Sequence, residues 1–171
     1  MVFSWAGRLA GLAACASLAG PLAARDNLGV FSAWGAFRDP AVPRCYAIAA
    51  PDTARAGLGE HDEHAAFASI GTWPRRQVRG QLHVRLSRTM APHSSIRLAL
   101  GSHRFDLTGA GADAWGQDAR MDAAIVAAMR SAGAIYVSAT DRAGHRFTDK
   151  FSLDGAATAM DAATIGCARL R

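Results

Sequence analysis

Histidine and carboxylate side chains come closest together at His61 and His64, which flank an Asp-Glu pair. On a helix, histidines three positions apart share a face, and imidazole with carboxylate is a ligand set that suits zinc or copper. Glycines precede this cluster, and no residue elsewhere in the sequence clearly completes a coordination sphere. The first interpretation of His61 and His64 is therefore a polar loop, with no metal and no cofactor. A metal-binding or enzymatic site is the alternative.

The other titratable residues form no recognisable catalytic group. His83 and His103 fall on the polar phase of alternating segments, where side chains are expected to face solvent. Asp106 and Asp113 are candidates for a carboxylate pair, but the first alternates outward from a predicted strand and the second has the position of a turn or cap residue. A histidine acts as a general base only with a partner and a substrate within reach. We predict no catalytic residue among them.

Motifs for nucleophilic catalysis and phosphate binding are absent from the sequence. It contains no Gly-x-Ser-x-Gly and no Ser-x-x-Lys, and the Gly-Ala-Gly-Ala run at 109–112 lacks the Gly-Lys-Ser/Thr that ends a phosphate-binding loop. The formal net charge of +5 is spread along the chain without a Lys/Arg block of the kind that binds nucleic acid. We therefore predict a non-enzymatic protein that does not bind nucleic acid.

Trp34, Trp73 and Trp115 are the candidate aromatic residues of a binding surface. Aromatic side chains are enriched in recognition surfaces, but in a small sheet they are more often anchors of the core. For Trp115, packing against the first turn of a helix that follows it is the alternative explanation. The sequence leaves both roles open for all three.

Residues 1–24 are typical of a secretory signal peptide. A short segment ending at Arg8 is followed by an apolar stretch of small residues, then by Pro21 and a Leu-Ala-Ala sequence. This order predicts cleavage near Ala24 and a protein of the periplasm or the secreted fraction. No later stretch has the length of a membrane-spanning helix.

A lipid anchor at Cys15 is the alternative to simple cleavage. Leu-Ala-Ala-Cys at 12–15 resembles a lipobox, and lipidation of Cys15 would tether the protein to a membrane. The apolar stretch before Cys15 is short for this purpose, and the apolar run continues beyond it. We expect the unlipidated form.

Removal of the first 24 residues leaves two cysteines, Cys45 and Cys167. In an oxidising compartment, the simplest expectation is one disulfide between them, closing a loop long enough to stabilise the fold by about 4–5 kcal/mol. Two free buried thiols are the alternative. The sequence has no Cys-x-x-Cys motif, so a redox role is not predicted.

Alternating apolar and polar residues predict a mostly β protein. Segment 80–88 has Leu82, Val84 and Leu86 on one side and polar residues on the other, as in a sheet with one buried face. The other predicted strands are 29–38, 44–49, 67–73, 95–100, 103–107, 134–139 and 145–153. Helical spacing places one internal helix at 118–130, with Asp118 as its N-cap, and a short C-terminal helix at 156–164. We predict a single domain at 25–171, made of β-sandwich-like antiparallel sheets with these two helices.

Several segments resemble the invasion-associated locus B family of exported alphaproteobacterial proteins. They are Trp34 with the Arg-Cys-Tyr-Ala-Ile run at 44–48, the His-Arg-Phe-Asp-Leu strand at 103–107, the Asp-Ala-Trp entry to the helix at 113–115, the Thr-Asp-Lys-Phe-Ser-Leu hairpin at 148–153 and Cys167. Phe151 replaces the family's usual tyrosine, and residues 51–92 match poorly. The resemblance implies a β-sandwich cell-envelope protein linked to host-cell association, without established catalytic residues. Its expected partner is a protein, a glycan or another envelope component.

Overall fold

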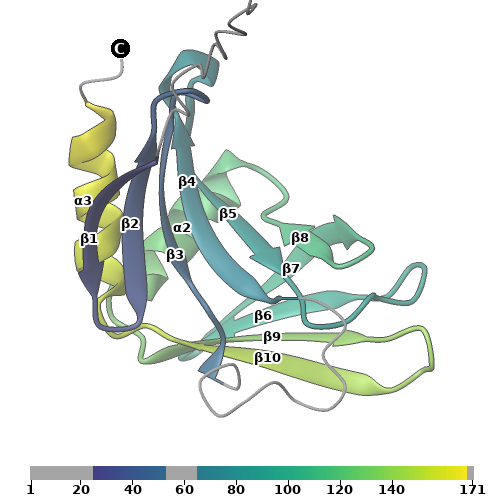
Figure 1. Ribbon diagram of the computed structural model, residues 1–171. Coiled ribbons are helices and arrows are strands. Elements are labelled where there is room, and N and C mark those ends of the chain that lie inside the picture. The colour runs from purple at the N-terminus through teal and green to yellow at the C-terminus, as the bar shows by residue number, and fades with distance from the viewer. Residues whose placement is uncertain (1–24, 53–64, 169–171) are drawn as a thin grey trace, which may run out of the picture.

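The computed structural model describes residues 25–52 and 65–168 (Figure 1). Their strands join into one ten-stranded sheet in the order β1-β2-β3-β4-β5-β8-β7-β6-β9-β10, and all neighbours are antiparallel. The strands are β1 Asp26–Phe31, β2 Trp34–Asp39, β3 Arg44–Ala49, β4 Phe67–Trp73, β5 Val78–Arg85, β6 Ile96–Leu100, β7 His103–Ala110, β8 Asp113–Trp115, β9 Ala134–Thr140 and β10 Arg146–Ser152. The helices are the 3-10 turn η1 Pro74–Arg76, α2 Ala119–Met129 and α3 Ala156–Cys167.

The sheet is strongly curved, so that β6, β9 and β10 run across the direction of β1 to β4 (Figure 1). The predicted fold class, mostly β with one internal and one C-terminal helix, is confirmed. The strands form one continuous curved sheet, in which β7 and β8 connect the two halves. Neither α2 nor α3 has the length and apolar composition that a bilayer crossing requires, and the same holds for every helix within the described ranges.

The local signals that predicted these elements act as expected. Asp118 caps α2, because its carboxylate accepts a hydrogen bond from the backbone N–H of Met121 at 2.7 Å. Gly101 has a φ of 53° in the tight turn between β6 and β7, a conformation that favours glycine. The alternation in β5 is also confirmed, since Leu82 and Val84 are fully buried.

Two predictions about strand boundaries are wrong. Segment 29–38 is two strands, β1 and β2, which form a hairpin whose turn includes Ser32 in a left-handed conformation (φ 51°). Asp113 lies in the three-residue strand β8, where a turn or cap was expected. The first difference arises because β1 and β2 pair across a tight turn, and the second because β8 pairs with β5, which is distant in sequence. The alternation within a single segment reveals neither pairing.

The two helices pack on one side of the sheet and enclose the core. Helix α3 lies on β1, β2 and β3, and α2 lies on β5. Trp34 is fully buried in this core, and its indole N–H donates a hydrogen bond to the carbonyl of Ser152 at 2.8 Å. The buried residues of both halves form one hydrophobic cluster.

Cys45 of β3 and Cys167 at the end of α3 are joined as a disulfide, the pairing that the sequence predicts. Their Cα atoms are 5.6 Å apart, within the range that a disulfide requires, and both residues are buried. The bond links the last helix to β3, the third strand from one edge of the sheet.

Candidate functional site

The side of the sheet opposite the helices carries a set of aromatic side chains that are only partly buried. In β3, Cys45 and Ala47 point toward α3 and are buried, whereas Tyr46 and Ile48 point to the other side and are half-exposed. Residues of β2, β4, β5 and β8 that point to the same side as Tyr46 and Ile48 contribute the other members of this set. We call it the aromatic face, and its members are Phe37, Tyr46, Phe67, Trp73, His83 and Trp115.

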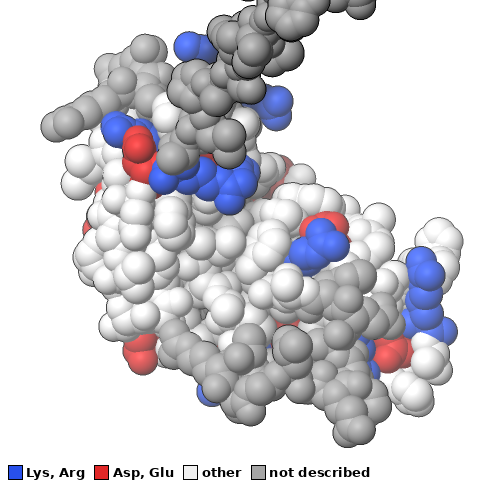
Figure 2. Space-filling view, viewed as in Figure 1, with Lys and Arg blue, Asp and Glu red and all other residues white. Residues whose placement is uncertain are grey.

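The register of the strands makes the aromatic face continuous. His83 is paired with Ser69 on one side and with Trp115 on the other, and Ser69 is paired in turn with Ile48. The neighbouring row contains Tyr46, which stacks on Phe37 with the ring centroids 5.6 Å apart. Figure 2, which shows this side of the sheet, has a broad area without charged side chains between charged groups. The face is therefore an apolar platform with a charged margin.

Glycines under two of the rings allow them to lie against the backbone. A Cβ atom at Gly71 would come within 2.5 Å of the Trp73 ring, and one at Gly35 within 2.8 Å of the Phe37 ring. These positions lack side chains because a neighbouring aromatic ring already occupies the space above them. The rings therefore lie close over the backbone of these two glycines.

His83 lies between Phe67 and Trp115 on this face. Its ring is parallel to that of Trp115, with centroids 5.1 Å apart and planes 6° apart, and Phe67 meets it edge-on at 5.1 Å. The Nε2 atom of His83 is 2.8 Å from one carboxylate oxygen of Asp113, and the other oxygen lies 3.8 Å from the guanidinium of Arg85. The imidazole is thus held between two aromatic rings and fixed in orientation by a carboxylate.

The predicted solvent exposure of His83 is only partly right, since 26% of its side chain is exposed. The alternation within β5 gives the correct phase for this residue. It does not reveal that Phe67 of the preceding strand β4 and Trp115 of the distant strand β8 both contact the imidazole.

The hydroxyl nearest to His83 in the sheet does not form a Ser-His pair with its ring. The hydroxyl of Ser69, the nearest hydroxyl by register, donates a hydrogen bond to the backbone carbonyl of His83 at 3.4 Å and not to the ring. A Ser-His pair requires a hydrogen bond between the hydroxyl and the imidazole. The arrangement therefore offers flat aromatic surface with fixed polar edges.

Asp106 and Asp113, which the sequence offers as candidates for a carboxylate pair, have different partners in the sheet. Asp113 lies opposite Ala110 in the β7–β8 ladder, whereas Asp106 lies opposite Arg97 in the β6–β7 ladder, with which it forms an ion pair at 3.5 Å. Each carboxylate has its own cationic or imidazole neighbour. The two belong to different parts of β7 and its partners, so they do not act together.

The three candidate tryptophans divide between the core and the aromatic face. Trp34 is a core residue, and the idea that it lines a binding surface is wrong. Trp73 and Trp115 are half-exposed on the aromatic face. The stacking of Trp115 on His83 gives it a role beyond the expected packing against the start of α2.

The candidate metal ligands His61 and His64 lie outside the described residues, as do Cys15 and Ala24. Within 25–52 and 65–168, His, Cys, Asp and Glu side chains form no group of three or more that is close enough to hold a metal ion. The metal-binding alternative therefore rests on its sequence pattern alone.

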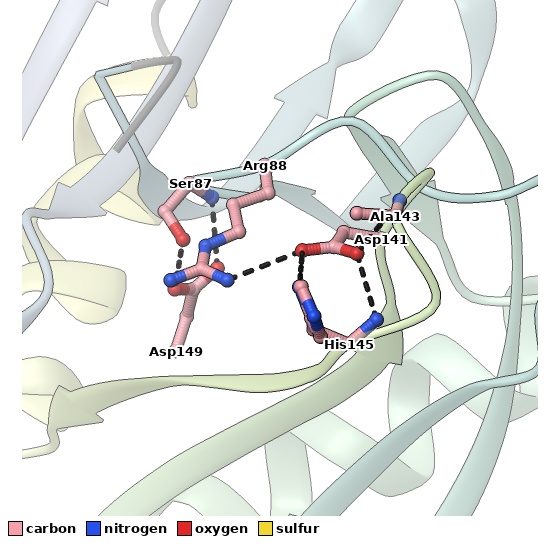
Figure 3. Close-up of polar contacts among 6 residues, drawn as sticks. All are labelled: Ser87, Arg88, Asp141, Ala143, His145 and Asp149. Atoms are coloured by element: carbon pink, nitrogen blue, oxygen red, sulfur yellow. Dashed lines mark hydrogen bonds and ion pairs between the residues drawn. The ribbon is translucent and has the colours of Figure 1, made fainter. Parts of the chain in front are cut away.

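A second polar cluster lies inside the protein, where β5 ends beside the β9–β10 hairpin (Figure 3). The backbone N–H and the hydroxyl of Ser87 both donate hydrogen bonds to the carboxylate of Asp149, at 2.9 and 2.6 Å. Arg88 donates one to Asp141 at 3.2 Å, and its guanidinium lies over the Phe147 ring. Ser87, Asp141 and Asp149 are buried, so a substrate has no access to them. The cluster links the segment that follows β5 to the β9–β10 hairpin, and we call it the hairpin joint.

Asp141 organises the hairpin turn in that joint. Its carboxylate accepts hydrogen bonds from the backbone N–H groups of Ala143 and His145 at 3.0 and 2.9 Å (Figure 3). The hydrogen bond from the His145 backbone, helped by those from Arg88 and Ala143, lowers the pKa of Asp141 below its ordinary value. The carboxylate is therefore held in its charged form.

No protein-family model, curated protein or solved structure matches the chain. The resemblance to the invasion-associated locus B family stays a prediction.

Proposed function

We propose that the protein is an exported, non-enzymatic binding module of the cell envelope that holds a polysaccharide on its aromatic face. The observation that carries this proposal is the parallel stack of His83 on Trp115, with Asp113 bonded to the imidazole at its edge. Flat rings and fixed polar edge groups, side by side and partly exposed, are the two features that a sugar ring requires of its binding site.

The chemistry of a pyranose ring favours this ligand class. One face of the ring presents polarised C–H bonds, which are attracted to the electron-rich faces of aromatic rings. Its margin carries hydroxyl groups, for which Asp113 supplies an acceptor and Gln81, on the same side of β5 as His83, supplies both a donor and an acceptor. A largely apolar site with a few placed polar groups is the usual composition of a small-ligand site.

Three observations support export to the envelope. The sequence of residues 1–24 has the order of a signal peptide. Cys45 and Cys167 form a disulfide, which persists in oxidising compartments. The resemblance to the invasion-associated locus B family implies the same location and connects this class of protein with host-cell association. Mass spectrometry of the protein from cells tests the proposal, with a chain starting near Arg25 as the expected result and a lipidated Cys15 or an uncleaved chain as the contrary one.

Co-sedimentation with purified peptidoglycan sacculi tests the binding function. The oxidised protein is expected to pellet with sacculi in a saturable way. Trp115→Ala removes the stacking platform and is expected to weaken binding about tenfold or more, since truncation of an aromatic hot-spot residue costs about 2 kcal/mol or more and about 1.4 kcal/mol corresponds to tenfold.

Tyr136→Ala is the matched control for that experiment. Tyr136 is also a large exposed aromatic residue, but it lies in β9, in the other half of the sheet. This variant is expected to bind like the wild type. Failure of the wild-type protein to pellet with sacculi, or equal binding by Trp115→Ala, would contradict the proposal.

A further inference from the structure

A cavity of about 540 Å³ opens between α2 and α3, on the side of the sheet opposite the aromatic face. Its volume lies within the range of about 300–1,000 Å³ that is typical of small-molecule sites. Strand β4, the turn η1 and the start of β5 close it from below. The apolar lining comes from Ile70, Val126, Met160, Ala163 and Cys167.

The margin of the cavity is basic. Arg75, Arg79 and Arg130 line it, and its described lining residues include no carboxylate. Arg130 forms an ion pair with Asp161 of α3 at 2.7 Å, which links the two helices. Arg75 and Arg79 are exposed and form no ion pair with any residue of the described ranges. Within the described ranges, therefore, no carboxylate pairs with Arg75 or Arg79 at this margin.

An apolar interior beneath a cationic margin is complementary to a molecule that has an apolar chain and an anionic head. We propose that this cavity binds a single-chain anionic amphiphile, a long-chain fatty acid. The acyl chain lies along Val126, Met160 and Ala163 between the two helices, and the carboxylate lies at Arg75 and Arg79. Each methylene removed from water adds favourable free energy, and a charge-assisted hydrogen bond from a guanidinium fixes the head.

This inference is independent of the proposed polysaccharide binding, because the two sites lie on opposite sides of β4. Ile70 lines the cavity, whereas its neighbour Ser69 points to the aromatic face. A variant that fills the cavity is expected to pellet with sacculi like the wild-type protein. The failure of one proposal therefore leaves the other standing.

Calorimetric titration with myristate below its micellar concentration tests the inference. Wild-type protein is expected to bind one myristate, while acetate, which has the head without the chain, does not bind measurably. Arg75→Gln/Arg79→Gln is expected to weaken myristate binding about tenfold or more and to leave binding of uncharged monomyristoylglycerol unchanged. Arg104→Gln/Arg120→Gln removes the same charge at exposed positions outside the cavity and is expected to bind myristate like the wild type.

Val126→Phe separates occupation of the cavity from attraction to the surface. The larger side chain fills the space between the helices, so myristate binding is expected to be lost while the melting temperature stays near that of the wild type. A melting curve of each variant shows that it is folded. Unchanged myristate binding by folded Val126→Phe, equal loss in the Arg104→Gln/Arg120→Gln control, or absence of myristate binding by the wild type would overturn the inference.

Discussion

The two sides of the β1–β5 region use small residues for opposite purposes. On the helix side, Ala36, Ala47 and Ala68 are fully buried, and their small side chains allow α3 to pack close to the strands. On the other side, Gly35 and Gly71 lie beneath the rings of Phe37 and Trp73 and leave those rings partly exposed. In both cases a missing side chain makes room for a neighbour.

The consequence is a division of labour between the two faces. Close packing on the helix side removes apolar surface from water, which is the main source of folding free energy. The aromatic face keeps apolar surface exposed, which costs stability and is retained where a partner covers it. We therefore expect substitutions on the helix side to lower stability and substitutions on the aromatic face to lower binding.

The largest expected contrast lies between two tryptophans. Trp34→Ala is expected to lower the free energy of unfolding by about 3–5 kcal/mol, because it leaves a cavity in a closed core. Trp115→Ala is expected to cost less than about 1.5 kcal/mol, since it removes one exposed stacking pair. Urea unfolding of both variants measures this difference, and equal losses would contradict the division between the faces.

Loss of the disulfide on the helix side is expected to have the next largest effect. Cys45→Ser, like reduction of the wild-type protein, frees α3 from β3 and is expected to lower stability by about 2–5 kcal/mol. Thermal melting of the oxidised and reduced wild type measures this loss. The Cys45→Ser variant is the control, because a reductant is expected to leave its melting temperature unchanged. Coincident melting of oxidised and reduced wild type is the outcome that speaks against this prediction.

Neighbouring positions in β3 provide a closer comparison of the faces. Ala47→Phe forces a ring under α3 and is expected to lower stability by about 1–3 kcal/mol. Ile48→Phe, one residue later, adds a ring to the half-exposed aromatic face and is expected to change stability by less than about 0.5 kcal/mol. Both values come from chemical unfolding, and a reversed order would show that the two sides are wrongly assigned.

The smallest predicted effect concerns the pH dependence of stability, which depends on two buried carboxylates whose pKa values are shifted in opposite directions. The pKa of Asp141 in the hairpin joint is lowered, so its contribution to stability is present above its ordinary value of 3.8 and is lost as the pH falls below it. Asp122 of α2 is buried, and this burial raises its pKa even though the carboxylate accepts a hydrogen bond from the Leu82 backbone N–H at 3.1 Å. Ionisation of Asp122 therefore lowers the stability of the fold as the pH rises above 3.8.

Unfolding measured from pH 3 to pH 7 distinguishes the two carboxylates. The stability deficit of Asp141→Asn relative to wild type is expected to shrink toward acid. Asp122→Asn, whose side-chain oxygen still accepts the Leu82 hydrogen bond, is expected to gain relative to wild type toward neutral pH. The same pH dependence in both variants would contradict the assigned directions.

Local signals in the sequence were sufficient for the elements that depend on neighbouring residues. The alternation of Leu82 and Val84 identifies β5, Asp118 marks the start of α2, and the count of cysteines outside the predicted signal peptide pairs Cys45 with Cys167. Each follows from a short segment or a simple inventory. The fold class follows from their sum.

The aromatic face was not predictable in this way, because it is a product of register. Phe67, His83 and Trp115 come from three strands, and only the pairing of β4 with β5 and of β5 with β8 brings them together. Alternation assigns each residue a side of its own strand but does not say which side the helices cover. For the same reason the sequence left Trp34 and Trp115 with equivalent roles.

Nuclear magnetic resonance of the tryptophan side chains tests the binding face most directly. In oxidised protein labelled with [15N]tryptophan and titrated with soluble peptidoglycan fragments, the indole N–H signals of Trp73 and Trp115 are expected to shift in a saturable manner. The signal of Trp34, which is buried and bonded to Ser152, is expected to stay in place. Saturation without a change at Trp73 and Trp115 would contradict the assignment of this face as the binding surface.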